Sequence, residues 1–142
     1  MKQLIQLARL PAAERWLLVE AVTAVTVASL LLRLLRFSRV ASRLGRHMAE
    51  SPPRQDRENL GGARRVRWAV DSAARHLPWK PMCLPQAVGA QWMLRRRRIP
   101  STLYLGINPA DGYDAHAWVR VGTLIVTGGP RQDRFAIVSS FA

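Results

Sequence analysis

The sequence contains few cysteines, lysines and acidic residues. Cys83 is the only cysteine, so no internal disulfide can form and a secreted module held by disulfides is not expected. A reducing compartment fits better, and we expect the cytoplasm. The chain also lacks a glycine-rich loop for phosphate and a cluster of His, Cys, Asp and Glu with metal-ligand spacing. These gaps lead us to expect neither a cofactor nor a metal ion.

Negative charge is scarce. The chain has 22 Lys and Arg against 9 Asp and Glu, a net charge of +13, and Lys2 and Lys80 are its only lysines. Such a surplus attracts nucleic acid, anionic lipid or an acidic polypeptide without specifying which. A compositional bias of the source genome would explain the arginines equally well. No recognisable nucleic-acid-binding motif is present and the tryptophans are scattered, so we expect no specific nucleic-acid partner.

No long uncharged run is present either. Residues 16–35 have the length of a membrane helix, but Glu20 lies among them and the uncharged part from Ala21 to Leu32 is only 12 residues. A spanning helix would need roughly 18 or more. We therefore expect a helix from Ala12 to Leu35 that is covered by protein on most sides, with a membrane unlikely as a partner. A cleaved signal peptide is not expected, because no small-residue cleavage site follows the apolar run.

The remaining pattern predicts helices first and an antiparallel sheet afterwards, which is an α+β layout of one domain's size. Ser-Pro-Pro and Gly-Gly indicate a loop, which divides the chain into an N-terminal helical region (1–49), a connection (50–63) and a core (64–142). After Pro100 apolar residues alternate, and Asn-Pro-Ala-Asp-Gly predicts a turn. The predicted helices are 37–45, 64–77 and the segment from Cys83 to Arg98, and the predicted strands are 103–107, 115–121, 124–127 and 135–138.

Cys83 and His116 form the candidate catalytic pair. Cys83 stands at or just before the start of a helix, and the first turn of a helix tolerates Pro85. A thiol attacks as its thiolate, and a helix N-terminus with a nearby imidazolium lowers the pKa of catalytic cysteines. His116 lies in a predicted strand, on the face opposite the aliphatic Ala117 and Val119, which turns it towards the other layer or the cleft. A cysteine nucleophile with a histidine base is the chemistry that this pattern favours.

Three segments together resemble a known family. They are Cys-Leu-Pro-Gln-Ala-Val-Gly-Ala-Gln-Trp-Met-Leu-Arg-Arg-Arg-Arg-Ile-Pro from Cys83, Leu-Tyr-Leu-Gly-Ile from Leu103 and Ala-His-Ala-Trp-Val from Ala115. In this order they look like the leader peptidase of lasso-peptide biosynthesis, a transglutaminase-like cysteine protease. Residues 10–44 are similar in style to the stand-alone short form of that enzyme.

The resemblance implies a papain-type core, with a helix carrying the cysteine packed on an antiparallel sheet carrying the histidine. Cys83 would attack the last leader peptide bond of a ribosomally made precursor, and His116 would take the thiol proton and return it to the leaving amine. The implied partners are the precursor's leader peptide, a separate leader-binding protein and the ATP-dependent macrolactam ligase that closes the ring. Family members recognise a threonine at the penultimate leader position.

The family's third catalytic group is an aspartate about a dozen residues after the histidine, and this sequence departs from that pattern. A two-residue loop at Gly122-Thr123 predicts pairing of 121 with 124, 119 with 126 and 116 with 129. The residues beside His116 would then be Thr127, Gly128 and Gly129, none of them a carboxylate. Asp133 is our first choice, Asp111 or Asp114 could approach from the preceding loop, or the site works as a dyad. The backbone N–H of Cys83 is the obvious oxyanion donor.

Two other readings compete with a peptidase. One is a basic nucleic-acid-binding module, suggested by the arginine count, and the other is a non-catalytic scaffold in which Cys83 is a buried small side chain. Reactivity of the thiol separates these readings from the first, because a buried structural thiol reacts slowly.

Overall fold

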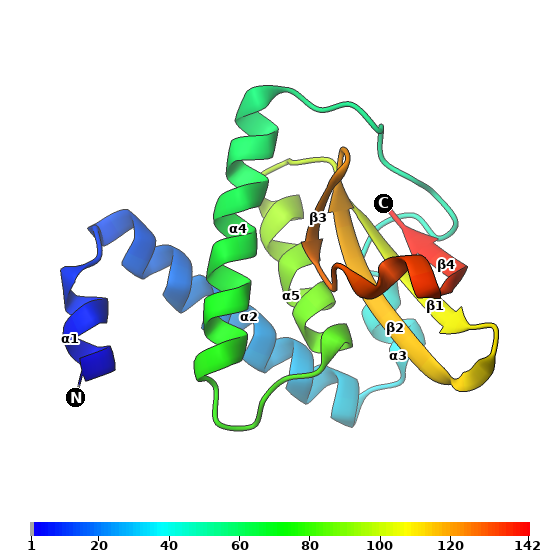
Figure 1. The fold of residues 1–142 in the computed structure, drawn as a ribbon, viewed down its shortest axis with the longest axis horizontal. Helices are drawn as coiled ribbons and strands as arrows, with labels where there is room; N and C mark the ends of the chain where they lie inside the picture. Colours follow the sequence, from blue (N-terminus) through cyan, green and yellow to red (C-terminus); the bar gives the residue numbers. More distant parts are fainter. Residues whose placement is uncertain (1) are drawn as a thin grey trace.

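The computed structural model describes residues 2–142, without the side chains of Gln3, Leu4, Tyr113 and Arg131. Three helices precede a long helix α4, and α5 leads into a sheet that occupies the C-terminal part (Figure 1). The predicted α+β class is confirmed. The elements are α1 (Lys2–Arg9), α2 (Ala12–Leu34), α3 (Phe37–Ala41), α4 (Arg57–His76), α5 (Cys83–Arg96), β1 (Thr102–Asn108), β2 (Asp111–Val121), β3 (Leu124–Thr127), the 3-10 helix η1 (Arg131–Arg134) and β4 (Ala136–Phe141).

The sheet is antiparallel with strand order β3-β2-β1-β4, so β3 and β4 are its edges. The tight turn at Gly122-Thr123 is confirmed, and Val121 pairs with Leu124 as predicted. The pairing of 119 with 126 is wrong, because Val119 pairs with Thr127. A bulge causes this shift, because β3 has one extra, unpaired residue opposite the step from Val119 to Arg120 of β2.

The main core lies between one face of the sheet and the helices α2, α4 and α5. Leu103, Val119 and Val121 of the sheet are fully buried there, and α5 buries seven residues from Ala87 to Leu94. The small residues of α5 allow close packing, as predicted. A Cβ atom on Gly89 would lie 3.1–3.2 Å from atoms of Val25, so the α2 backbone passes directly over this glycine.

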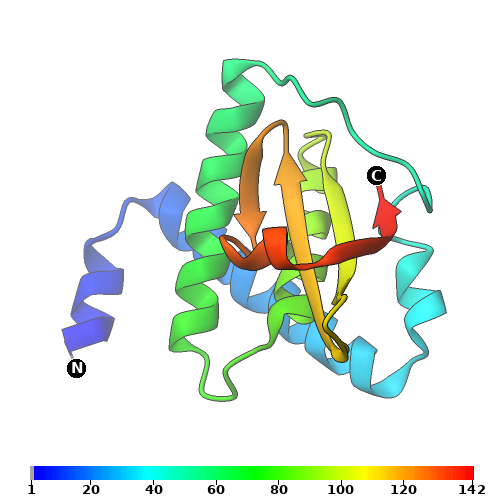
Figure 2. The same ribbon diagram turned by 45° about the vertical axis from the view of Figure 1, so that its right-hand side comes forward.

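The opposite face of the sheet has a smaller cluster of its own. Tyr104, Trp118 and Phe135 are buried together there, and Tyr104 stacks on Trp118 with ring centroids 5.4 Å apart. The segment containing η1 crosses this face, while α5 and α2 lie against the other (Figure 2). Side chains alternate along β2, so Ala117 and Val119 reach the main core while His116 and Trp118 reach the outer cluster.

Helix α2 corrects one expectation. We expected an apolar helix to be covered on most sides, but only Leu17, Ala21, Val25 and Ala28 are buried. These four follow helical spacing and make one inward stripe, because only one side of α2 packs on α4 and α5. The helix is long and apolar enough to cross a membrane by length and composition alone, and most of its apolar window is not buried.

The connection after α3 also ends earlier than expected. α4 begins at Arg57, not near Arg64, and Asp56 caps it by accepting a 2.7 Å hydrogen bond from the Asn59 backbone N–H. Gly61 and Gly62 therefore lie inside the helix. Gly62 lets the end of the Ile99 side chain pack close to the α4 backbone, since a Cβ there would lie 2.7 Å from the Ile99 Cδ1 atom.

The predicted division of the chain at residues 50–63 stays a prediction. The two parts share one core, and the buried Gln91 of α5 links them. Its amide nitrogen donates to the carbonyl of Leu44 (2.9 Å) and to that of Phe141 (3.1 Å), while its oxygen accepts from the Ser101 hydroxyl (2.9 Å). This buried amide is satisfied on both sides, so it holds the N-terminal region against the sheet.

Candidate active site

Cys83 is the first residue of α5 and is half-buried. The extended approach through Pro81 and Met82 ends where Pro85 can enter the first helical turn without losing a hydrogen bond. Met82, the N-cap residue, makes no side-chain cap bond. No side chain therefore caps the first backbone N–H groups of α5. These groups are suited to stabilise negative charge near Cys83.

His116 stands in the middle of β2, opposite Gly106 of β1, and its side chain is 9% exposed. Its ring lies between Trp118 (centroids 5.9 Å apart) and Phe135 (4.9 Å) on the outer face of the sheet. Gly106 leaves room for this packing, because a Cβ there would lie 2.8–3.0 Å from atoms of Phe135 and Trp118. The aromatic contacts restrict the orientation of the imidazole.

Two cavities meet at this pair, and Cys83 and His116 line both of them. The first, of about 710 Å³, lies between α4 and the edge strand β3. The second, of about 610 Å³, lies between the segment before α5 and the strands β1 and β2. The two predicted catalytic residues thus line both cavities. A peptide that occupied both cavities would pass Cys83 and His116 with one of its peptide bonds.

The carbonyl of Gly128 is the hydrogen-bond partner of the His116 ring, with Nε2 and the oxygen 2.5 Å apart. A carbonyl can only accept, so Nε2 carries the proton and Nδ1 is the nitrogen of the neutral ring that can accept one. Gly128 has φ +83°, and a Cβ there would approach the Ala117 carbonyl oxygen to 2.5 Å and the Trp118 Cβ to 2.7 Å. Only glycine places its carbonyl at this point without strain.

The three candidate aspartates lie elsewhere. Asp133 is exposed on η1 and belongs to the lining of neither cavity, so its assignment as third group stays a prediction. Asp111 and Asp114 lie at the start of β2, where Asp114 accepts a 3.4 Å hydrogen bond from the Asn108 amide. Cys83 and His116 line the same two cavities, whereas none of these carboxylates lines either one.

Several residues of the site were not predicted. Arg67 and Asp71 of α4 and Gln86 of α5 line the first cavity, and Gln86 donates from its amide to the Pro81 carbonyl at 2.8 Å. Gln86 follows Cys83 by three residues, a spacing that places both at one end of the helix and could have indicated it. For Gly128 the sequence offered only the Gly-Gly pair as a mark of a turn. Its contact with His116 could not be predicted, because it depends on the bulge between β2 and β3. Among the described residues, no group of three or more His, Cys, Asp and Glu could hold a metal ion.

Comparison with known proteins is consistent with this geometry. The family model described as "Transglutaminase-like superfamily" matches residues 18–140, which is most of the chain and runs from within α2 to within β4. No curated protein and no solved structure gives a significant match. A helix that begins with cysteine and packs on an antiparallel sheet carrying histidine is the core that the sequence led us to expect. The chain therefore belongs to the transglutaminase-like superfamily, whose members are commonly cysteine peptidases.

Proposed function

We propose that this protein is a cysteine peptidase that removes the leader from a lasso-peptide precursor, with Cys83 as nucleophile and His116 as base. The observation that supports this most strongly is that the two residues line the same two cavities, one from the N-terminus of α5 and the other from strand β2. A structural cysteine and an unrelated histidine have no physical reason to share both hollows.

The chemistry proposed for the pair is an acyl transfer to sulfur. His116 takes the proton of the Cys83 thiol, and the thiolate attacks the carbonyl carbon of the scissile peptide bond. The tetrahedral intermediate collapses to a thioester as the C–N bond breaks, and His116 gives its proton to the leaving amine. A water molecule, deprotonated by His116, then hydrolyses the thioester and restores the thiol.

Nδ1 is the atom of His116 assigned to this proton transfer, since Nε2–H donates to the Gly128 carbonyl. The carbonyl performs the orienting part of the third group's role, because it selects the tautomer and holds the ring. Asp133 remains the alternative, and it would have to replace or supplement this bond. For the oxyanion we propose the backbone N–H of Cys83, at the uncapped start of α5.

We propose that the substrate binds in extended form along β3. This strand is an edge of the sheet, and the first cavity follows it from Thr123 to Gly129 before reaching Cys83. An extended peptide can add to such an edge through main-chain hydrogen bonds. Thr127 and Gln132 line the same wall, and in the described part of the chain their buried oxygens Oγ1 and Oε1 have no hydrogen-bond partner, so a local side-chain shift would let them bond an incoming peptide.

The other side of the scissile bond would lie in the second cavity, whose lining is mostly apolar. Its walls include Trp79, Pro81, Met82, Leu105 and Ile107. The substrate would accordingly present polar or main-chain groups on one side of the cleavage point and apolar side chains on the other. The proposed partners are the leader peptide, a separate leader-binding protein and the macrolactam ligase, and the positive net charge of +13 suits an acidic peptide or protein among them.

The direct test is cleavage of a precursor peptide followed by mass spectrometry, with the leader-binding protein present. Cys83→Ala and His116→Ala should each lower the rate by at least about 10³-fold, because removal of any member of a nucleophile-base unit costs most of the catalysis. His76→Ala is the matched control and should cleave normally, since His76 bonds to the Ser72 carbonyl within α4. Cleavage by Cys83→Ala at the wild-type rate would contradict the proposal.

The role of Gly128 has its own test. Gly128→Ala should lower kcat about 10- to 100-fold with little change in KM, because a displaced carbonyl misorients the base. Gly112→Ala is the control, since a Cβ at Gly112 meets no atom within 4 Å. Asp133→Asn should leave kcat unchanged. If Asp133→Asn is the more damaging variant, the carboxylate and not the peptide carbonyl orients His116.

A further inference from the structure

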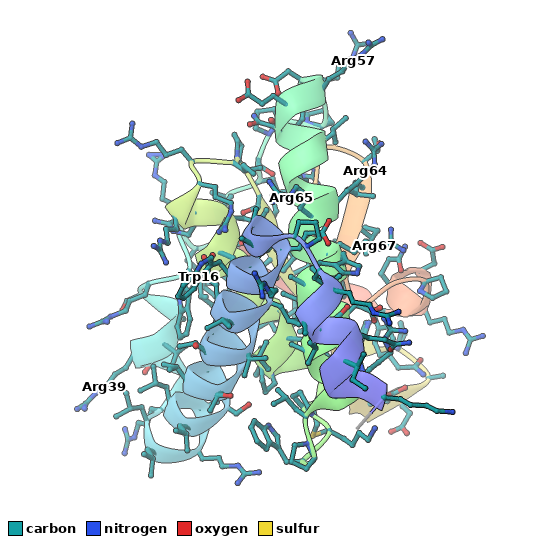
Figure 3. All side chains as sticks on the ribbon, turned by 90° about the vertical axis from the view of Figure 1, so that its left-hand side faces the viewer. Trp16, Arg39, Arg57, Arg64, Arg65 and Arg67 are labelled. Atoms are coloured by element: carbon teal, nitrogen blue, oxygen red, sulfur yellow. The ribbon has the colours of Figure 1, made fainter. Side chains whose placement is uncertain are left out.

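The outer face of α2 carries an apolar stripe that nothing in the described structure covers. Trp16 is 74% exposed, Leu30 53% and Leu34 77%, and Val19 and Val27 lie between them on the same side of the helix. With Thr23 between Val19 and Val27, the spacings are three or four residues throughout, which keeps these side chains in one line. From Trp16 to Leu34 the stripe is about 27 Å long at the usual helical rise. It faces away from the active site, on the side shown in Figure 3.

The polar groups within the stripe are already satisfied. The Thr23 hydroxyl in the stripe donates to the Val19 carbonyl at 2.8 Å, and farther round the helix the Ser29 hydroxyl donates to the Val25 carbonyl at the same distance. Glu20, beside the stripe, is bound to Arg97 at 2.6–2.7 Å and lies 3.6 Å from Arg96. The Arg97 hydrogen bond holds the pKa of Glu20 below its usual range, so the carboxylate stays ionised and paired. This face can therefore leave water without exposing a lone polar group to an apolar medium.

Arginines stand at both ends of the stripe. Arg15 is exposed next to Trp16 in the sequence, and Arg96 and Trp16 line one groove of about 490 Å³. Arg33, Arg36 and Arg39 are exposed at and beyond the Leu34 end, and Figure 3 shows Arg39 at that end of the face. Helices α1 to α3 hold five Lys and Arg against two Glu, so positive charge predominates in this part of the chain.

We propose that this stripe binds the surface of an anionic lipid bilayer, with α2 lying parallel to it. An apolar line with basic ends and a tryptophan at one end suits the boundary between acyl chains and negatively charged headgroups. A soluble acidic polypeptide would engage the arginines but would leave the apolar line uncovered. The helix does not leave the protein to span the bilayer, because Leu17 and Val25 are held in the core and α2 crosses α5 at Gly89.

This binding is independent of the proposed peptidase activity. Peripheral attachment differs from the expectation that a membrane is an unlikely partner, which rested on the short uncharged run that would be needed to span a bilayer. The helix α1 projects from the body of the protein beside this face, and its Ile5 (53% exposed) and Leu7 (37%) extend the apolar surface (Figures 1 and 3).

The test is co-sedimentation of the full chain with vesicles of phosphatidylglycerol and phosphatidylcholine in equal parts, against vesicles of phosphatidylcholine alone. We expect binding to the anionic vesicles and at least about tenfold weaker partition for the double variant Trp16→Glu/Leu30→Glu. The control Met48→Glu/Ile137→Glu makes the same charge change at apolar residues that are 65% and 53% exposed elsewhere. It should weaken partition less than about threefold, which is the loss of long-range attraction alone.

Three results would overturn the proposal: no binding of the wild type, an equal loss in both double variants, or binding that phosphatidylcholine vesicles reproduce. A measurement on the wild type guards against a variant that fails to fold. Tryptophan emission should shift to shorter wavelength on anionic vesicles, and Trp16→Phe should remove the shift. Soluble polyglutamate that causes the same shift would assign the face to an acidic polypeptide and would also overturn the proposal.

Discussion

Helices α2 and α5 cross each other, yet they are buried to very different degrees. α2 is the more apolar of the two, but it is buried along a single stripe. α5 ends with Arg95 and Arg96, two more arginines follow it, and the helix is nevertheless buried through its middle. The difference is one of position, because α5 lies between the sheet and α2 while α2 has a neighbour on one side only. Burial follows the layer in which a helix lies and not its apolar content.

The first prediction concerns the crossing point. Gly89→Val should lower the free energy of unfolding by about 3 kcal/mol, because the added atoms must fit against Val25 in a packed core. Urea unfolding measures the change. Gly61→Val in α4 is the control and should cost little, since a Cβ at Gly61 meets no atom within 4 Å. Equal losses in both variants would mean that α2 and α5 do not cross closely at Gly89.

The second prediction separates the two sides of α2. Leu17→Ala on the inner stripe should cost about 2–4 kcal/mol of unfolding free energy, since it leaves a cavity in the core. Leu34→Ala, the same change at a side chain that is 77% exposed, should cost less than about 0.5 kcal/mol. Thermal unfolding of the two variants in parallel compares them. A similar loss at Leu34 would show that the outer side of α2 is covered by protein.

The third and smallest effect concerns the ion pair that joins the C-terminal end of α5 to α2. The pKa of Glu20 is lowered in the folded protein, chiefly by the Arg97 hydrogen bond, so the pair stabilises the fold above the ordinary pKa of a glutamate and loses this effect as the pH falls through the lowered value. Glu20→Gln should therefore cost about 1 kcal/mol at neutral pH and almost nothing at about pH 3.

Asp71→Asn breaks the exposed Asp71 and Arg75 pair and serves as the control, with an expected cost below about 0.5 kcal/mol. Chemical unfolding across this pH range measures both variants. A cost for Glu20→Gln that does not change with pH would contradict the role given to the charge.

The residues that could be predicted from the sequence are those with strong local signals. Pro81, Pro85 and the run of helix formers after them placed Cys83 at a helix start, and alternation placed His116 on the strand face opposite Val119. Short-range stereochemistry decides both features, so they do not depend on the rest of the fold.

The features that were missed depend on distant parts of the chain. Gly61 and Gly62 suggested a loop, but both lie inside α4. The side chain that packs against Gly62 is Ile99, which is far along the chain. The exposed side of α2 could not be recognised because nothing local tells which apolar side chains find a neighbour. The bulge at Val119 and Arg120 has no glycine or proline to mark it, and it decides which main-chain group meets His116.

Because the partner of His116 is the backbone carbonyl of Gly128, no change of side-chain chemistry can remove the acceptor itself. A carboxylate beside a catalytic imidazole can be lost by a single codon change, whereas every residue type retains a peptide oxygen. The acceptor is also electrically neutral at every pH, so protonation cannot remove the hydrogen bond that the His116 ring donates to it. A substitution can change the position of this carbonyl only by changing the path of the backbone. That path requires a residue without a side chain at position 128.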